Sequence, residues 1–283
     1  MAGMRGELLT RSLAAGLVFL LPAGARSLAS PLGSASIGEL RGQGAEMEDL
    51  EGAPVPGPRE SLDKAEVAAR AYPYARLSAN AYDGGSEDWC AVIDRRRDEE
   101  TGFDAYACRE VSTGRVIVVF RGTDELKDWL KTDIPQPLFV PRQYRQGFEY
   151  AREMAGSHGD VALTGHSMGG GIAQYAASRL GLEAWTFNPA GLGLVTMLRA
   201  GSCDPGETCR GDASRITNVI VAGEPLAAAR FFLGPDFVKL RGSVEHFLPA
   251  GGGGLTSHGM SNVLAALESK QRRSAGAQYA SLK

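Results

Sequence analysis

Residues 160–181 read DVALTGHSMGGGIAQYAASRLG, and this stretch decides the fold class. Its first part, Asp160 to Gly165, is a short apolar run typical of a buried strand, and its last part, Gly169 to Leu180, has the small residues of a packed helix. Gly181 stands where a left-handed residue commonly ends a helix. The sequence therefore predicts a strand and a helix joined by one sharp turn.

The residues of that turn follow the pattern Gly-X-Ser-X-Gly, with Ser167 at its centre. Glycine on both sides lets the strand and the helix approach closely, so the serine hydroxyl projects above the sheet near the positive end of the helix. This pattern between a strand and a helix is typical of a nucleophile elbow. We expect Ser167 to be the nucleophile, and His166 to point elsewhere.

Further strands and helices alternate on both sides of this turn. Apolar and β-branched runs predict strands, and helical spacing predicts helices. Such alternation predicts an α/β fold with a mostly parallel sheet and helices on both faces. The predicted strands lie at 115–120, 183–188, 216–222 and about 237–240, and the predicted helices at 61–78, at 144–155 and from about residue 260.

A serine nucleophile needs a base and an acid, and in this architecture both follow it in the chain. Two histidines are available downstream. We favour His258, in a loop before the last helix, over His246, which we expect to be a half-buried structural residue. For the acid we favour Glu224, directly after a predicted strand, with Asp236 as the rival.

Composition narrows the function further. The chain has 283 residues, a formal net charge of −3 and 43% hydrophobic residues, enough to build a core. The near-neutral charge without a long basic block argues against a nucleic-acid-binding protein. No phosphate loop, zinc-ligand spacing or calcium-binding loop occurs in the sequence, so no cofactor or metal is implied.

Several short motifs occur in a fixed order along the chain. They are FRGT at 120–123, W at 129, GF at 147–148, GHSMGG at 165–170 and TFNP at 186–189. Together they resemble the class 3 lipase branch of the α/β-hydrolase superfamily, over roughly residues 62–265. The resemblance implies an α/β-hydrolase fold and an ester hydrolase with a Ser/acid/His triad. The family's acid is usually Asp, whereas this chain has Glu224 followed by Pro225.

The resemblance also implies an oxyanion hole. Its backbone donors would be the N–H groups of Thr123 and Met168; the alternative for Thr123 is a strand-end hydroxyl that bonds its own backbone. The family carries an interfacial lid where this chain has the amphipathic segment 124–140, with Leu126 and Trp129 in its apolar stripe. The alternative is an ordinary surface helix with its apolar side inward.

The N-terminus has the layout of a secretory signal peptide: basic residues, an apolar run at 12–21 and small residues at 23–25. We predict a signal peptide at 1–25, a flexible linker or arm at 26–61 and an α/β-hydrolase domain at 62–283. The protein would then be exported, to the periplasm or the extracellular space. The alternative is an uncleaved N-terminal anchor.

Export places the four cysteines in an oxidising compartment. Cys90 and Cys108 lie in two short runs around a charged stretch, and a hairpin turn centred near residue 99 would set them opposite each other. Cys203 and Cys209 flank a turn-like sequence that can close a small loop. We predict the disulfides Cys90–Cys108 and Cys203–Cys209; the alternative is four free buried thiols.

These observations predict an exported serine hydrolase that cleaves acyl esters of lipids, of the lipase or phospholipase type, through an acyl-enzyme. A short-chain esterase and an acyltransferase are alternatives on the same fold, and a catalytically inactive binding protein is an alternative of another class. The expected partners are a lipid or small ester substrate and, transiently, a membrane surface.

Overall fold

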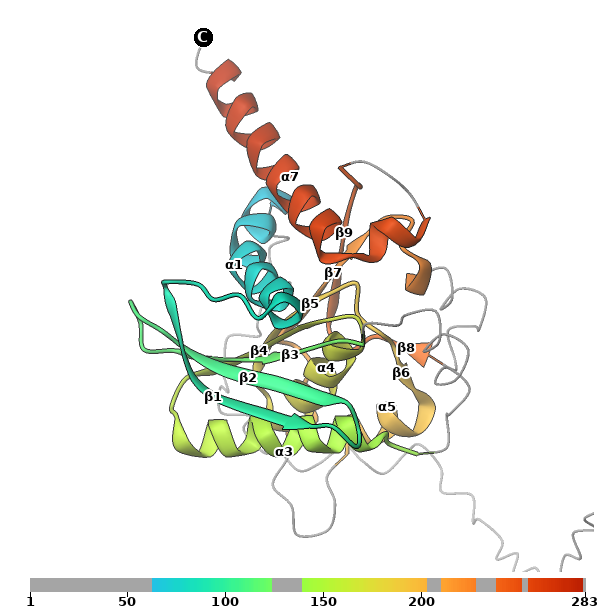
Figure 1. Ribbon diagram of the computed structural model, residues 1–283. Coiled ribbons are helices and arrows are strands. Elements are labelled where there is room, and N and C mark those ends of the chain that lie inside the picture. The colour runs from blue at the N-terminus through green and yellow to red at the C-terminus, as the bar shows by residue number, and fades with distance from the viewer. Residues whose placement is uncertain (1–62, 124–138, 203–209, 228–237, 251–253, 282–283) are drawn as a thin grey trace, which may run out of the picture. The chain divides into compact units, whose positions relative to one another are not determined.

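The computed structural model describes residues 63–123, 139–202, 210–227, 238–250 and 254–281 (Figure 1). The predicted signal peptide at 1–25 and the predicted arm at 26–61 lie outside these residues. So do most of the predicted lid segment and the pair Cys203 and Cys209. None of the described helices is both long and apolar enough to cross a membrane.

Seven strands form one sheet in the order β1-β2-β3-β4-β5-β7-β9 (Figure 1). β1, β2 and β3 pair antiparallel, and every pair from β3 to β9 is parallel. This confirms the predicted α/β fold with a mostly parallel sheet. The strands are β1 (Cys90–Asp98), β2 (Phe103–Glu110), β3 (Val116–Phe120), β4 (Val161–His166), β5 (Glu183–Phe187), β7 (Ile216–Val221) and β9 (Ser243–Phe247).

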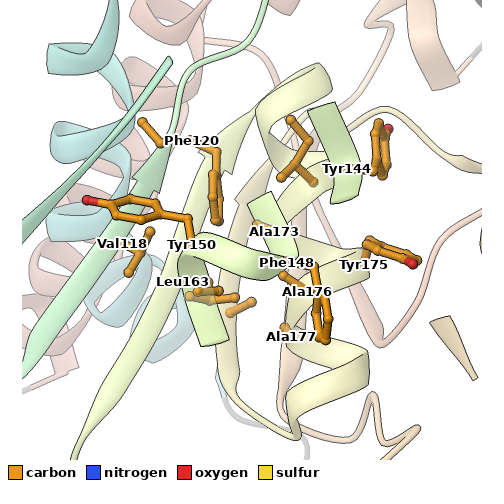
Figure 2. Packing of buried hydrophobic residues seen from close by; sticks show 14 of the residues in the cluster. Val118, Phe120, Tyr144, Phe148, Tyr150, Leu163, Ala173, Tyr175, Ala176 and Ala177 are labelled. Atoms are coloured by element: carbon orange, nitrogen blue, oxygen red, sulfur yellow. The ribbon is translucent and has the colours of Figure 1, made fainter. Parts of the chain in front are cut away.

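Helices cover both faces of the sheet because the central strands are apolar on both sides. In β3, Val118 and Phe120 join one buried cluster, whereas Ile117 and Val119 join another. The first cluster includes residues of α3 (Arg142–Ser157), α4 (Met168–Leu180) and α5 (Leu194–Ala200). The second includes residues of α1 (Lys64–Asp83) and α7 (Met260–Ser281). Figure 2 shows residues of the first cluster, among them Val118 and Phe120 of β3.

Two elements differ from the sequence prediction. The sequence predicts a helix at 61–78, whereas α1 continues through Pro73 to Asp83. Proline removes one helical hydrogen bond, and the burial of neighbouring Ala71, Tyr74 and Ala75 against the sheet offsets that loss.

The last strand of the sheet was missed by the sequence analysis. The strand predicted near 237–240 is β8 (Val238–Lys239), which pairs with β6 (Leu192–Gly193) in a separate two-stranded sheet. The main sheet ends instead on β9. Only Phe247 of β9 is buried, so this edge strand lacks the apolar pattern by which a buried strand is found.

The disulfide Cys90–Cys108 is present, with 5.4 Å between the two Cα atoms. The pairing prediction is confirmed, but the predicted register is wrong. Cys90 faces Glu110, and Val92 faces Cys108. The turn lies between Asp98 and Phe103, one to two residues later than expected, and a bulge between Val92 and Asp94 shifts the register again. The two cysteines are therefore bonded diagonally across the hairpin.

Candidate active site

Ser167 occupies a strained turn between β4 and α4. Its φ of 57° and ψ of −125° lie in a region of backbone conformation that residues other than glycine rarely adopt. A Cβ on Gly165 would lie 2.5 Å from the backbone of Gly169, and one on Gly169 would overlap the carbonyl of Phe120. Both glycines are thus required by the close approach of strand and helix, as a nucleophile elbow demands.

The backbone of Ser167 is held from three sides. Its N–H donates to the carbonyl of Phe187 at 3.1 Å, and its carbonyl accepts from the N–H groups of Gly171 at 3.1 Å and Ala190 at 2.9 Å. The residue is 2% exposed. These contacts fix the strained backbone, because such a conformation persists only where its surroundings determine it.

His258 and Glu224 form a buried pair beside this turn. The Nδ1 atom of His258 lies 3.0 Å from Oε2 of Glu224, although 34 residues separate them in sequence. Glu224 follows β7 and is fully buried; His258 ends the short 3-10 helix η1 (Gly254–His258) and is 5% exposed. The carboxylate also accepts from the N–H groups of Leu226, at 2.9 Å, and Ala227. These donors fix the carboxylate against the imidazole.

The imidazole of His258 lies next to the elbow. Its ring centre is 4.7 Å from that of His166, the residue before Ser167. Its Nε2 atom is buried and has no hydrogen-bond partner among the residues that the structure describes. A hydrogen bond from the hydroxyl of Ser167 to this atom is therefore not formed here. Catalytic hydrogen bonds of this kind often tighten only when substrate is bound.

Of the two rival residues, the structure describes His246, and it does not bring this histidine to the site. His246 lies on β9 opposite Ile220 and is exposed, not half-buried as the sequence suggested. Its carbonyl accepts from the amine of Lys64 at 3.1 Å. The edge position of β9 explains the exposure. Asp236 lies outside the described residues.

The two predicted oxyanion donors belong to segments that lie beside Ser167. Met168 is the first residue of α4. Thr123 ends the segment that follows β3, and a Cβ on its neighbour Gly122 would lie 3.2 Å from the Cβ of Ser167. The chain after β3 therefore passes directly beside the elbow. Residues 124–138, with Leu126 and Trp129 of the predicted lid, lie outside the described part of the chain.

His166 has a role that the sequence analysis missed. Its Nε2 lies 2.7 Å from the carbonyl of His258, and its Nδ1 lies 2.8 Å from the hydroxyl of Tyr82. Because a carbonyl can only accept, Nε2 carries the proton, and Nδ1 accepts from Tyr82. The amide of Asn188 donates to the same carbonyl at 2.9 Å. His166 and Asn188 together hold the backbone of His258.

Burial, together with the smaller effect of the neighbouring His258, lowers the pKa of His166 to about 3. His166 is therefore neutral at physiological pH, with one ring nitrogen donating and the other accepting. The sequence signal for the contact of His166 with the His258 carbonyl was the position of His166 directly before Ser167. In the described part of the chain, no group of three or more His, Cys, Asp or Glu residues could hold a metal ion.

Known proteins are similar to this chain in sequence. The family model of the Tle-like phospholipase domain matches residues 65–280. An extracellular phospholipase A1 of Serratia liquefaciens is 31% identical over 176 residues, which are 62% of this chain and 52% of that protein. The chain thus spans about half the length of this relative.

Solved lipase structures are also similar. A triacylglycerol lipase from Penicillium expansum matches at 14% identity with a TM-score of 0.46, over 65% of this chain and 80% of that chain. A triacylglyceride lipase from Rhizomucor miehei matches at 16% identity with a TM-score of 0.45, again over 65% and 80% of the two chains.

Proposed function

The chain belongs to the Tle-like phospholipase domain family, and from this membership we propose that it is a phospholipase that hydrolyses carboxylic esters of glycerophospholipids. The relative from Serratia liquefaciens, an extracellular phospholipase A1, supports the same substrate class. The order FRGT, GHSMGG and TFNP, which resembles the class 3 lipases, supports ester chemistry on this fold.

In the proposed mechanism Ser167 is the nucleophile and His258 the general base. The hydroxyl oxygen of Ser167 attacks the ester carbonyl while its proton moves to Nε2 of His258. The imidazolium then gives this proton to the leaving glycerol oxygen, which leaves an acyl-enzyme on Ser167. A water molecule, deprotonated by the same imidazole, attacks the acyl carbonyl and releases the fatty acid.

Glu224 is proposed as the acid of the triad. Its carboxylate accepts from Nδ1–H of His258, so it holds the imidazole in the tautomer whose Nε2 can take the serine proton. The backbone N–H groups of Met168 and Thr123 are proposed to bind the oxyanion of the tetrahedral intermediate. Each such donor is typically worth about 2.7–4 kcal/mol in the transition state.

The contact of His258 with Glu224 carries this proposal. Two ionisable side chains from distant parts of the chain are buried together beside a strained serine. A buried carboxylate and imidazole that served only the fold would gain little over apolar residues of similar volume. A pair aimed at an elbow is the arrangement that serine activation requires.

We further propose that the protein is exported. The signal-peptide layout at 1–25 supports export, and so does the disulfide Cys90–Cys108, because disulfides persist mainly in oxidising compartments. Whether the mature protein begins after residue 25 can be read by mass spectrometry of secreted material.

Hydrolysis of defined lipids tests the proposed function. Wild type and Ser167→Ala are incubated with phosphatidylcholine, phosphatidylglycerol, triacylglycerol and a dissolved short-chain ester, and released fatty acid is measured. We expect the wild type to release fatty acid from phospholipids faster than from triacylglycerol, and the variant to lose several orders of magnitude of this rate. Hydrolysis of the dissolved ester alone would favour the short-chain esterase, and an undiminished rate in Ser167→Ala would refute the mechanism.

A further inference from the structure

A cavity of about 720 Å³ lies on the face of the sheet covered by α3, α4 and α5. None of Ser167, Glu224 and His258 lines it. Arg179, one of its lining residues near the end of α4, is about 18 Å from Ser167 along the helix axis. The volume is within the range of sites that bind small molecules.

Arginine dominates the lining of this cavity. Five arginines and a single carboxylate surround it: Arg142, Arg145, Arg152, Arg179, Arg199 and Glu149. Arg142 and Arg145 are exposed side chains of the first turn of α3. Arg145 makes no ion pair with any residue that the structure describes, and Arg142 makes only an exposed one, with Glu100. Guanidinium groups bind phosphate oxygens through two parallel hydrogen bonds, so this lining suits a phosphate group.

The wall of the cavity holds its guanidinium groups in place with aromatic rings. Phe148 and Tyr175 lie beside each other where α3 meets α4 (Figure 2). The guanidinium of Arg179 is 4.5 Å from the ring centre of Phe148 and donates to the hydroxyl of Tyr175 at 3.1 Å. Arg152 lies 5.5 Å from the centre of the same ring.

Exposed apolar side chains adjoin the arginines. Phe139 lines the cavity and is 54% exposed, and on α5 Leu194 and Leu198 are exposed as well. α5 begins four residues after Ala190, whose N–H donates to the carbonyl of Ser167. Arginines together with exposed apolar side chains fit a lipid surface, where phosphate groups and acyl chains occur together. Inorganic phosphate would gain nothing from contact with the exposed apolar side chains.

We propose that the arginine-lined cavity binds the phosphate of an anionic phospholipid and thereby docks the protein on anionic membranes. The choice of a lipid as ligand rests on the phospholipase function proposed above, whereas the affinity for phosphate rests on the arginines alone. Since none of Ser167, Glu224 and His258 lines the cavity, it would recognise a lipid of the surface while another lipid is cleaved.

Vesicles of ether lipids test this proposal, because they contain no carboxylic ester for the protein to cleave. Binding of the full chain to dialkyl-ether phosphatidylglycerol and to dialkyl-ether phosphatidylcholine vesicles is measured by flotation. The test variant is Arg142→Gln/Arg145→Gln, both exposed. The matched control is Arg109→Gln/Arg273→Gln, which removes the same charge at exposed positions on β2 and α7.

We expect wild type and control to bind the phosphatidylglycerol vesicles about tenfold more tightly than the phosphatidylcholine vesicles, and the test variant to lose most of this preference. Raising the salt concentration should reduce the preference in wild type. Equal binding by the test and control variants would overturn the cavity as the site. Stabilisation of wild type by inorganic phosphate, with no preference between the vesicles, would assign free phosphate and overturn the lipid.

Hydrolysis of a dissolved short-chain ester is measured on the same proteins. The test variant should retain this rate, because neither arginine belongs to the proposed catalytic residues. Lost vesicle preference with retained hydrolysis supports the cavity proposal. A wild type that binds vesicles selectively but hydrolyses no ester would contradict the phospholipase function and leave the phosphate site standing.

Discussion

We propose Glu224 as the triad acid, where the class 3 lipases that this chain resembles usually have Asp, and its surroundings explain how the longer side chain would serve. It follows β7 directly, and its own N–H donates to the carbonyl of Val221 at 3.2 Å. The carboxylate then folds back onto the N–H groups of Leu226 and Ala227. This tight turn takes up the extra methylene group and leaves Oε2 facing His258.

Replacing Glu224 by Gln should reduce kcat on phospholipid about ten-thousand-fold, by analogy with the corresponding change in serine proteases. An amide can present its N–H to Nδ1 and so favour the wrong tautomer of His258. Asp236→Asn is the control and should keep nearly full activity. Thermal unfolding of each variant checks the fold. A large loss in Asp236→Asn with an active Glu224→Gln would make Asp236 the acid.

His166 should make stability depend on acid pH. Its pKa is about 3 in the folded protein, against about 6.5 in an unfolded chain. Between these values only the unfolded state binds the proton, so the free energy of unfolding falls as pH falls. This residue alone contributes a slope of about 1.4 kcal/mol per pH unit.

The variant His166→Gln lacks this proton uptake. Urea unfolding between about pH 4 and pH 6 should therefore give a smaller slope for the variant than for wild type. Tyr82→Phe, which keeps the imidazole but removes its hydrogen-bond donor, serves as a milder companion. Parallel slopes in wild type and His166→Gln would show that the imidazole is not buried in its neutral form.

The hairpin of β1 and β2 is fastened by Cys90–Cys108 at the edge of the sheet away from β7 and β9. The bridge closes a loop of 18 residues, which corresponds to about 3 kcal/mol of stabilisation in the chain-entropy model. Cys90→Ala/Cys108→Ala should lose stability of this order in urea unfolding. Ester hydrolysis at room temperature should hardly change, because β2 and β3 separate β1 from the elbow on β4.

A reductant provides the control for the hairpin. Dithiothreitol should lower the stability of the wild type in urea unfolding. It should not do so through this bridge in the double variant, which lacks both cysteines. A double variant as stable as the oxidised wild type would show that the hairpin does not need the bridge.

Elements with apolar residues on both faces could be predicted from the sequence, whereas the edge strand β9 could not. β3 and β4 are continuous apolar runs, and the helix after Ser167 is marked by small residues and by Gly181. β9 is exposed along most of its length, so no apolar period marks it. The register of β1 and β2 escaped prediction because it depends on the turn and on a bulge, neither of which leaves a periodic signal.

Across the whole molecule, parallel strands explain why Ser167, Glu224 and His258 could be predicted as a group. Ser167 follows β4 and Glu224 follows β7, and the carboxyl ends of parallel strands share one edge of a sheet. The contact of His166 with the carbonyl of His258 could not be predicted, because it depends on the exact course of a loop. The arginine-lined cavity could not be predicted from the sequence either, because its residues come together only when α3, α4 and α5 pack against one another.

Covalent labelling with a fluorophosphonate tests most directly the claim that His258 and Glu224 activate Ser167. The reagent reacts with activated serines, and peptide mapping shows which serine carries the label. The account predicts one label, on Ser167, with a rate that falls by several orders of magnitude in His258→Ala and stays near wild type in His246→Ala. A label on another serine, or equal labelling rates in the two histidine variants, would contradict it.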